Sequence, residues 1–410
     1  MRLSGGDTHL SYCANIHPGE TWAETEVALR RHLPEVKARF SPAAPFGVGL
    51  RLSALAAEEL GEPRALDAFR AWLAAEGLYV FTINGFPYGA FHGKPVKRTV
   101  YRPDWRQPER LAYSDRLADL LAVLMPDDLE EGSVSTVPGA WKGDLSATGS
   151  DTGAGGAASI ADTLLRHTAH LHRLRERTGR TVVLGLEPEP GCLLETTGET
   201  LDFFGRFLHG AGAVGRLAEL AGLSRPQAED ALHRHLGVCL DTCHAAVEFE
   251  DPVETADRLN AAGIRIAKVQ LSAALRLDRA DADALAGLAA FDDPVYLHQT
   301  VVRHADGRLT RYDDLPDALA ASPASLGEEW RVHFHVPVFL ENLGGDGPGG
   351  FRTTAPDLAR LLDRHRVSPV SRHLEVETYS FGVLPPELRR DGVVDNIVRE
   401  LAWARARLDP

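Results

Sequence analysis

Apolar runs and amphipathic segments alternate along most of this chain. Short apolar runs rich in β-branched residues predict buried strands, and segments with apolar residues three or four positions apart predict the helices between them. Because strands that alternate with helices form right-handed βαβ units, the pattern predicts a parallel sheet. Strands are expected at residues 9–17, 46–53, 78–89, 133–141, 181–191, 236–244, 264–272 and 373–380.

Eight such units close a (β/α)8 barrel, the TIM barrel, and this is the fold that we expect. The runner-up is an open doubly wound sheet, but no Gly-rich fingerprint follows the first strand, which weakens a dinucleotide-binding version of it. We expect a single domain over residues 1–410, with an insertion at 273–342 before the last strand. In the insertion, residues 298–312 predict a hairpin and residues 330–342 an extra strand. Residues 142–159 are so rich in Gly and Ser that we expect a mobile loop there.

The composition is that of an ordinary globular enzyme, with 44% hydrophobic and 25% charged residues among 410. A formal charge of −14 without a basic stripe argues against nucleic-acid binding. No apolar run approaches the roughly 18 residues of a membrane span, and the first ten residues lack the apolar core of a signal peptide. Four cysteines near predicted strand ends suit reduced thiols, so we expect a cytoplasmic protein.

Acidic side chains gather where several predicted strands end. Successive side chains of a strand point to opposite faces, so residues two positions apart lie together on one face. Carboxylates inside a barrel are costly unless a cation or a metal ion neutralises them. A divalent ion takes such oxygen-rich ligand sets, whereas the bland alternative is a set of buried ion pairs that support the barrel. The shared faces carry Glu187 with Glu189, Cys239 with Asp241, Lys268 with Gln270 and Ser272, and Glu375 with Glu377 and Tyr379.

The sixth predicted strand ends abruptly in Asp241-Thr242-Cys243-His244. A carboxylate and an imidazole at such an exit lie at the C-terminal mouth of a parallel barrel, where they could hold a divalent metal, or a metal and its substrate. The alternative is structural: Asp241 caps the helix that follows, and His244 lies in its first turn. The residues alone leave both interpretations open.

The strand ends LEPEP, CLDTCH and EVETY, in that order, resemble those of the xylose isomerase-like barrels. That superfamily comprises sugar isomerases, epimerases and the type IV apurinic endonucleases. Over nearly its full length, from NIHPGE through GLRLS, NGFPYG, FHG, EPEPGC, KVQLS and VHFHVP to ELAW, the chain resembles more narrowly the EboE family of TIM-barrel proteins. This narrower resemblance implies a role in metabolite traffic, with a small-molecule substrate and partner proteins from the same bacterial gene cluster.

The broader resemblance implies a divalent metal bound by a glutamate of the fifth strand, an aspartate of the sixth, a histidine of the seventh and a glutamate of the eighth. By motif position these are Glu187, Asp241 and, in the last strand, Glu377, with Glu375 as the fallback. His244 falls where the epimerases place a substrate-contacting histidine and the endonucleases a zinc ligand.

Gln270 stands where the superfamily has its seventh-strand histidine. A glutamine carbonyl is a weaker and harder ligand than imidazole, which disfavours a tight zinc site and suits magnesium or manganese. His333 or His335 on the extra strand could supply the missing nitrogen; the other alternative is that the ion has been lost. A trinuclear zinc cluster is not expected. The expected cofactor is a divalent ion, Mn, Mg or Zn, at Glu187, Asp241, Gln270 and Glu377.

Five side chains are assigned to substrate binding. His17 follows the first strand, although His-Pro-Gly is also a plain turn. Arg51 on the second strand could bind a carboxylate or phosphate, or pair with a barrel glutamate. The set is His17, Arg51, Asn84, Glu189 and His335.

The first hypothesis is a metal-dependent isomerase or epimerase of a small polyhydroxylated or hydroxy-carbonyl compound. Glu187 and Glu377 would be the acid/base pair on opposite substrate faces, while His244 and Lys268 orient oxygens and the metal stabilises an enediolate. Burial could make Lys268 a proton carrier, or it forms an ion pair with Glu187 or Glu377. The alternatives are a non-catalytic metabolite-binding protein, favoured by Gln270, and a metal-dependent hydrolase on the same residues.

Overall fold

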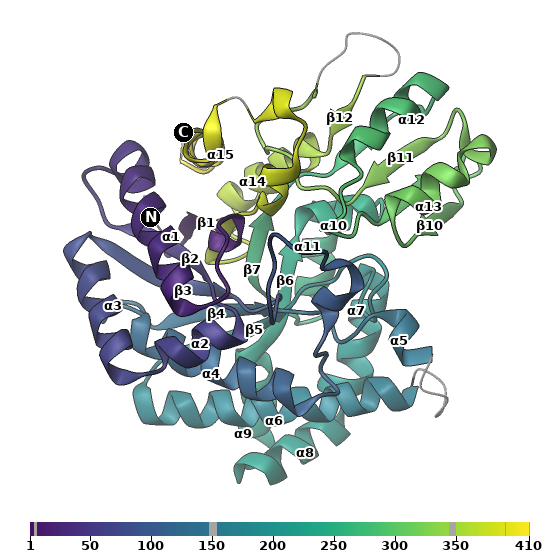
Figure 1. Cartoon of the computed structure of the whole chain (residues 1–410). Coiled ribbons are helices and arrows are strands. Elements are labelled where there is room, and N and C mark those ends of the chain that lie inside the picture. The colour runs from purple at the N-terminus through teal and green to yellow at the C-terminus, as the bar shows by residue number, and fades with distance from the viewer. Residues whose placement is uncertain (4–5, 147–153, 344–349, 390, 410) are drawn as a thin grey trace.

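Eight parallel strands form the first sheet, in the order β1-β13-β7-β6-β5-β4-β3-β2. Cys13 and Gly49 form a parallel bridge between the two ends of this order, so the sheet closes into the expected (β/α)8 barrel (Figure 1). The computed structural model describes residues 1–410 except 4–5, 147–153, 344–349, 390 and 410. The barrel strands are β1 (His9–Tyr12), β2 (Phe46–Arg51), β3 (Leu78–Asn84), β4 (Glu131–Thr136), β5 (Thr181–Leu186), β6 (Leu236–Asp241), β7 (Arg265–Leu271) and β13 (His373–Val376).

Most barrel strands are shorter than the segments that predict them. β5 ends at Leu186 and β13 at Val376, so Glu187 and Glu377 are the first residues beyond their strands. Asp241 is the last residue of β6 and the N-cap of the short helix α10 (Thr242–Val247). The polar ends of the predicted segments therefore belong to the loops at the C-terminal mouth, where barrel enzymes carry their sites.

Amphipathic helices cover the outside of the barrel (Figure 1). Their ends follow the usual capping chemistry: Thr21 forms a capping box with Glu24, and Asp251 caps a helix that begins with Pro252. The longer helices are α1 (Trp22–Phe40), α3 (Pro63–Ala75), α4 (Pro108–Leu124), α6 (Ala154–Thr178), α8 (Ala211–Ala221), α9 (Arg225–His235), α11 (Pro252–Ala261), α14 (Ala355–Val367) and α15 (Gly392–Leu408).

The loop expected at residues 142–159 is wrong at both of its ends. Residues Lys142–Ser146 form the short helix α5, and α6 already begins at Ala154. Ala157 and Ile160 of α6 are buried in the core, so packing outweighs the low helix propensity of the glycines nearby. The rest of that loop, residues 147–153, lies outside the described residues.

A second, antiparallel sheet lies between β7 and β13 in the sequence, with the order β10-β9-β11-β8-β12 (upper right in Figure 1). In the segment that predicts a hairpin, β9 pairs antiparallel with β10. The extra strand expected at 330–342 is wrong beyond Val332, where β11 ends. His333 and His335 therefore lie in an irregular segment. The strands are β8 (Leu275–Leu277), β9 (Thr300–Arg303), β10 (Leu309–Tyr312), β11 (Glu329–Val332) and β12 (Arg352–Thr353).

One continuous cluster of buried apolar side chains joins the barrel to the second sheet. It includes Leu10 of β1 and Leu374 of β13 together with Leu275 of β8 and Trp330 of β11. The second sheet is thus packed against the barrel, next to the C-terminal ends of its strands. Among the helices that the structure describes, none has the length and apolar character needed to cross a bilayer.

Candidate metal centre at the carboxyl ends of the strands

Three carboxylates meet at the C-terminal mouth of the barrel. Glu187, Asp241 and Glu377 each offer an oxygen, and these oxygens lie within 4.8 Å of one another. The three residues are 2%, 1% and 4% exposed, so water cannot screen their mutual repulsion. The structure thus brings together the carboxylates that the alternation of strand residues placed on one face.

The two carboxylate oxygens of Asp241 differ in their contacts. Its Oδ1 accepts hydrogen bonds from the amides of Cys243 (2.7 Å) and His244 (3.0 Å) and from Ser272 Oγ (2.7 Å). This is the helix cap that the sequence offered as one interpretation. Its Oδ2 is buried and has no hydrogen-bond partner among the described residues, so it remains available as a ligand. Both interpretations of Asp241 are compatible with this geometry.

Glu377 is held by amide side chains from β3, from β7 and from the 3-10 turn after β1. Its Oε1 accepts from Asn15 Nδ2 (2.7 Å), Asn84 Nδ2 (3.0 Å) and Gln270 Nε2 (3.2 Å). Since Gln270 donates its amide N–H to Glu377, the carbonyl Oε1 of Gln270 is its free end, and that atom is buried without a partner in the described part of the chain. Asn84, which the sequence assigns to substrate binding, lines the site mainly by orienting Glu377.

A cation would stabilise the buried negative charges of the three carboxylates. Burial, followed by the negative charge of Asp241, raises the pKa of Glu187 well above its usual value. Burial and the charges of Glu187 and Asp241 do the same to the pKa of Glu377. Glu187 Oε2 is likewise buried and unpartnered within the described residues. The three carboxylates, with unpartnered oxygens on Glu187 and Asp241, therefore offer donors that fit a hard divalent ion.

Lys268 does not reach this site. It forms an ion pair with Glu375 in the barrel interior, and both side chains are fully buried. Burial lowers the pKa of Lys268, but the adjacent charge of Glu375 outweighs burial and raises the pKa above its usual range. A raised pKa disfavours release of the proton from Lys268. Its ion-pair partner is Glu375 rather than Glu187 or Glu377.

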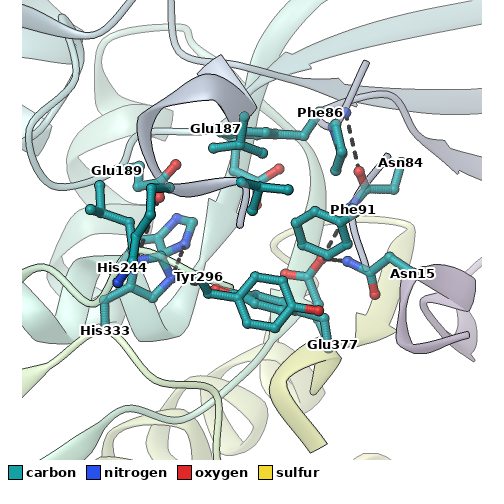
Figure 2. Close-up of a pocket in the computed structure, with 16 residues that line it drawn as sticks. Asn15, Asn84, Phe86, Phe91, Glu187, Glu189, His244, Tyr296, His333 and Glu377 are labelled. Atoms are coloured by element: carbon teal, nitrogen blue, oxygen red, sulfur yellow. Dashed lines mark hydrogen bonds and ion pairs between the residues drawn. The ribbon is translucent and has the colours of Figure 1, made fainter. Parts of the chain in front are cut away.

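A cavity with about 50 Å³ of free space opens above the carboxylates (Figure 2). Three aromatic rings border it: Phe91 lies 5.2 Å from Tyr296 and 5.1 Å from Tyr379, centroid to centroid, and Tyr296 lies 5.0 Å from Tyr379. The cavity thus joins a polar floor to an apolar wall, as small-molecule sites do. Its amide and ionisable lining comprises Asn15, Asn84, Lys97, Glu187, Glu189, His244, His333 and Glu377, and Lys97 is paired with Asp314.

Glu189 lies in the cavity wall beside a histidine. Its Oε1 accepts hydrogen bonds from Tyr101 Oη (2.7 Å) and Gln299 Nε2 (3.1 Å). Burial raises the pKa of Glu189 to about 8, although these hydrogen bonds lower it. Glu189 therefore holds a proton near neutral pH in the absence of a cation, and its position suits the substrate contact assigned to it.

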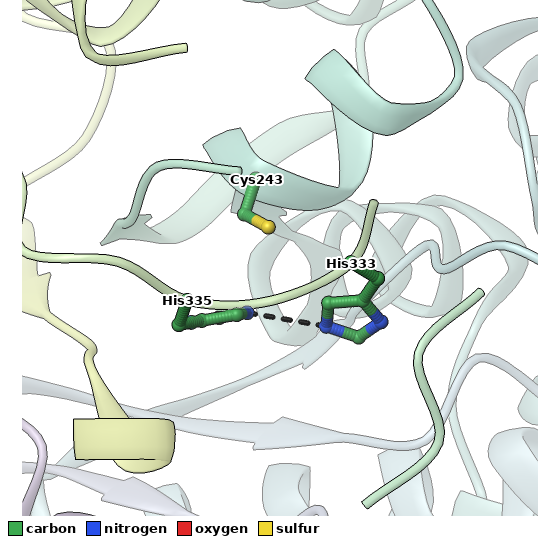
Figure 3. Close-up of side chains that lie close together, drawn as sticks. All are labelled: Cys243, His333 and His335. Carbon is green, nitrogen blue, oxygen red and sulfur yellow. Dashed lines mark hydrogen bonds between the residues drawn. The ribbon is translucent and has the colours of Figure 1, made fainter. Parts of the chain in front are cut away.

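Three imidazoles lie next to the carboxylates, on α10 and on the segment after β11. His333 Nε2 is 3.1 Å from His244 Nε2 and 3.2 Å from His335 Nε2. Burial lowers the pKa of His244 to about 4 and that of His333 well below its usual value, so both rings are neutral at neutral pH. His335, which the sequence assigns to substrate binding, is fully buried, does not line the cavity, and packs on Tyr379 at 4.6 Å between ring centroids. Figure 3 shows His333 and His335 with their ring nitrogens turned toward each other.

His17 and Arg51 lie apart from the carboxylate cavity and border a different, smaller one. Arg51 Nη1 donates to the carbonyl of Gly19 (2.7 Å) and Nη2 to that of Gly89, so the guanidinium ties two loops together. His17 Nε2 contacts Tyr12 Oη at 3.0 Å, and its ring stacks on His32. Both side chains thus support loops in this structure and lie outside the carboxylate cavity, and their role in substrate binding stays a prediction.

Some site residues were absent from the sequence predictions. Asn15 follows β1 just as Asn84 ends β3, and that parallel was the available signal for it. Gln299 and Tyr101 come from segments with no motif, and only tertiary contact places them against Glu189.

No protein-family model matches the sequence, and a comparison with curated proteins finds no match. Among solved structures, a xylose isomerase-like TIM barrel protein from Mycobacterium smegmatis in complex with magnesium is 12% identical over 100% of both chains, with a TM-score of 0.49. The IOLI protein with a zinc atom is 12% identical over 98% of both chains (TM-score 0.46). The probable 3-DHS dehydratase AsbF from Bacillus anthracis is 12% identical over 96% of this chain and 97% of its own (TM-score 0.45). At these values the barrel assignment rests on the strand order of this chain itself.

Proposed function

We propose that this chain is a metal-dependent isomerase or epimerase of a small polyhydroxylated or hydroxy-carbonyl compound. The observation that carries the proposal is the meeting of Glu187, Asp241 and Glu377 under a cavity, with buried oxygens that lack partners among the described residues. The ion would be held by these three carboxylates and by the carbonyl of Gln270. Oxygen ligands of this kind suit Mn²⁺ or Mg²⁺.

A divalent ion in this site would polarise adjacent hydroxyl and carbonyl oxygens and acidify the neighbouring C–H bond. Glu187 has the free oxygen to take that proton, because its Oε2 has no partner within the described chain. Glu377 directly follows β13, which is three strands away from β5 in the sheet order, so it approaches a bound substrate from a different part of the barrel mouth than Glu187 does. It is oriented by Asn15, Asn84 and Gln270 to return the proton there.

The apolar wall and the histidines set the orientation of the substrate. His244 and His333 line the polar side of the cavity, where an imidazole contacts a hydroxyl group. Phe91, Tyr296 and Tyr379 exclude water from the opposite side, which protects a carbanion-like species from stray protonation. The resemblance to the EboE family would place such a substrate among metabolites exchanged with proteins of one gene cluster.

The alternative function is a metal-free handling role, in which the protein binds a metabolite without chemistry. Gln270 favours it in the sequence, because it replaces the seventh-strand histidine of the superfamily. In the folded chain, however, Gln270 directs its N–H to Glu377 and keeps a buried carbonyl oxygen free, so the replacement retains a donor for a hard ion. This favours the catalytic proposal over the handling role.

The test is metal analysis of the full chain purified without chelator, followed by Mn²⁺ titration of Asp241→Asn and Glu377→Gln. We expect about one Mn²⁺ in the wild type and a loss of more than about 100-fold in affinity in both variants. Asp251→Asn is the matched control, because Asp251 also caps a helix but lies outside the barrel mouth. Full retention of Mn²⁺ by both site variants would overturn the proposal. With metal bound, exchange of solvent deuterium into a ketose at the carbon next to its carbonyl would support catalysis, and its absence from a panel of ketoses and hydroxy-ketones would favour the handling role.

A further inference from the structure

An amide at the edge of the carboxylate cavity has a hydrogen-bond acceptor that the protein leaves unused. Asn15 is 2% exposed, and its Nδ2 donates to Glu377 Oε1 at 2.7 Å. The free end of this amide is therefore Oδ1, which is buried without a partner among the described residues. Because Asn15 lines the cavity, its Oδ1 is an acceptor that a bound molecule can satisfy.

A hydrogen-bond chain from the insertion fixes a second acceptor. His92 Nε2 lies 2.6 Å from the backbone carbonyl of Asn15, which only accepts, so the ring proton is on Nε2. Burial lowers the pKa of His92 to about 4, so the ring is neutral at neutral pH and its Nδ1 carries a lone pair. Tyr296 Oη, 2.8 Å from that Nδ1, therefore donates its only hydrogen to His92. The Tyr296 hydroxyl keeps lone pairs alone, and Tyr296 lines the cavity.

Lys97 is the one lysine or arginine among the described residues that line the cavity, and its charge is already paired. Its ammonium donates to Asp314 Oδ2 (2.7 Å) and to the carbonyl of Asp293 (3.1 Å). The backbone holds it in place, because the amides of Val96 and Lys97 both donate to the carbonyl of Val295 in the insertion. An anionic substrate would have to break the pair between Lys97 and Asp314 to reach this cation.

The charge of the cavity floor also disfavours an anion. With a divalent ion bound, the three ionised carboxylates leave a net charge of −1, because three negative charges meet two positive ones. These groups are buried, so water does not screen their repulsion of a phosphate or carboxylate on the substrate. A hydroxyl group, by contrast, supplies the hydrogen that Asn15 Oδ1 and Tyr296 Oη lack.

We propose that Asn15 and Tyr296 select substrates with free hydroxyl groups, and that the pair of Lys97 with Asp314 excludes phosphorylated and carboxylated compounds. The substrate is thus an uncharged molecule rich in hydrogen-bond donors. Tyr296 and Asp314 both belong to the insertion between β7 and β13, so the insertion sets the specificity of the barrel mouth. The inference deepens the proposed function and rests on its site.

The experiment compares uncharged probes with their phosphates on the full chain in excess Mg²⁺. The probes are dihydroxyacetone, glyceraldehyde and fructose, each beside its monophosphate, and ligand-observed NMR gives the dissociation constants. We expect the wild type to bind at least one uncharged probe more than about 10-fold more tightly than its phosphate. Tyr296→Phe should weaken binding of that uncharged probe by roughly 3- to 10-fold and leave the phosphate unchanged. Tyr79→Phe is the matched control, because Tyr79 Oη also contacts a histidine, His9, at 2.8 Å, but at the start of β3, at the opposite end of the barrel.

Asp314→Asn tests the pairing of Lys97 in the opposite direction. The variant keeps the Oδ1 that accepts from the amides of His298 and Leu315 (both 3.0 Å) and caps α13 (Leu315–Ala320), and it removes only the negative charge. The released ammonium of Lys97 should tighten binding of the phosphates by about 10-fold. A folded Asp314→Asn chain with unchanged affinity for every phosphate would overturn the role of this pair.

A wild type in which no uncharged probe binds more tightly than its phosphate would overturn the proposal, whether or not the variants fold. Nitrogen NMR of His92 needs no probe: a ring proton on Nδ1 instead of Nε2 would remove Tyr296 as an obligate acceptor. The proposed function fails on different evidence, because probe preference is measured without turnover. A chain that prefers uncharged probes but binds no Mn²⁺, or exchanges no deuterium, would sink the proposed catalysis alone.

Discussion

Lys268 and Glu375 form an ion pair inside the barrel, and both side chains are 0% exposed. The pair joins β7 to β13, where Glu375 lies in register with Gln270. The alternation of strand residues places Glu375 and Glu377 on one face. The ion pair between Lys268 and Glu375 shows which of the two carboxylates is free for the cavity. Glu375 is neutralised one layer deeper in the barrel, which leaves Glu377 as the carboxylate of the cavity.

We predict that Lys268→Met lowers the free energy of unfolding by about 3–5 kcal/mol, because it leaves Glu375 as a buried carboxylate without its cation. The double variant Lys268→Met, Glu375→Met should recover most of that loss, since it removes both charges from the apolar interior. Urea denaturation of the metal-free chain measures both. A single variant within about 1 kcal/mol of the wild type would show that Glu375 does not depend on Lys268.

Gly49 has no side chain, which leaves room for the carboxylate of Glu375. A Cβ added at Gly49 would lie 1.7 Å from Glu375 Oε1 and 2.7 Å from the carbonyl oxygen of Tyr12. We predict that Gly49→Ala destabilises the fold by about 3 kcal/mol, because the buried ion pair must shift. Gly212→Ala is the control: it lies within α8 with no atom within 4 Å of its Cβ, and it should stabilise the chain by about 0.5–1 kcal/mol. Equal melting temperatures for the two variants would contradict the predicted clash.

Local sequence rules were sufficient for the barrel and for half of the site. Buried apolar runs predicted all eight barrel strands, since a parallel sheet covered by helices buries both faces of each strand. Period-two alternation placed Glu187 with Glu189, and Glu375 with Glu377, on shared faces near strand exits, with Asp241 at the exit of the sixth strand. The alternation needs only the residues of one strand at a time, whereas the choice of Glu187, Asp241 and Glu377 came from the resemblance to the xylose isomerase-like barrels.

The remainder of the site depends on contacts between distant segments. The partner of Lys268 is set by the closure of the barrel, and β7 and β13 are about a hundred residues apart. The contact of His333 with His244 depends on the path of the inserted segment, which leaves the strand after Val332. The sequence left Arg51 open between an anion site and a pair with a barrel glutamate, and its contacts with two loop carbonyls could not be read from its own strand.

Glu400 of α15 provides a pH-dependent test of the structure away from the cavity. It is buried, and Thr378 Oγ1 (2.6 Å), Asn396 Nδ2 (2.8 Å) and the amide of Val338 (3.2 Å) donate to it. Burial raises its pKa to about 7, from a usual value of 4.5. Because the folded pKa is the higher one, its contribution to stability is full below pH 4.5 and is lost as the pH rises through 7.

We therefore predict that the stability advantage of the wild type over Glu400→Gln shrinks by about 3 kcal/mol between pH 4 and pH 8. Glutamine does not titrate, so the variant serves as the pH-independent reference at this position. Urea denaturation of both proteins across this range measures the difference. A constant gap would mean that Glu400 ionises in the folded chain as readily as in the unfolded one.

Binding of Mn²⁺ to the metal-free chain should release protons. Burial, with the charge of Asp241 among the causes, raises the pKa of Glu187 and of Glu377 well above its usual value in the absence of an ion, so these groups hold protons more tightly than exposed carboxylates do. An ion binds the carboxylate form, and its affinity should therefore rise with pH as those protons become easier to remove. Calorimetry at pH 7 in buffers of different ionisation enthalpy gives the number released, which we expect to be about one or more per Mn²⁺. Glu377→Gln should release fewer protons with any ion that it still binds, and heats that do not depend on the buffer would contradict the raised pKa values.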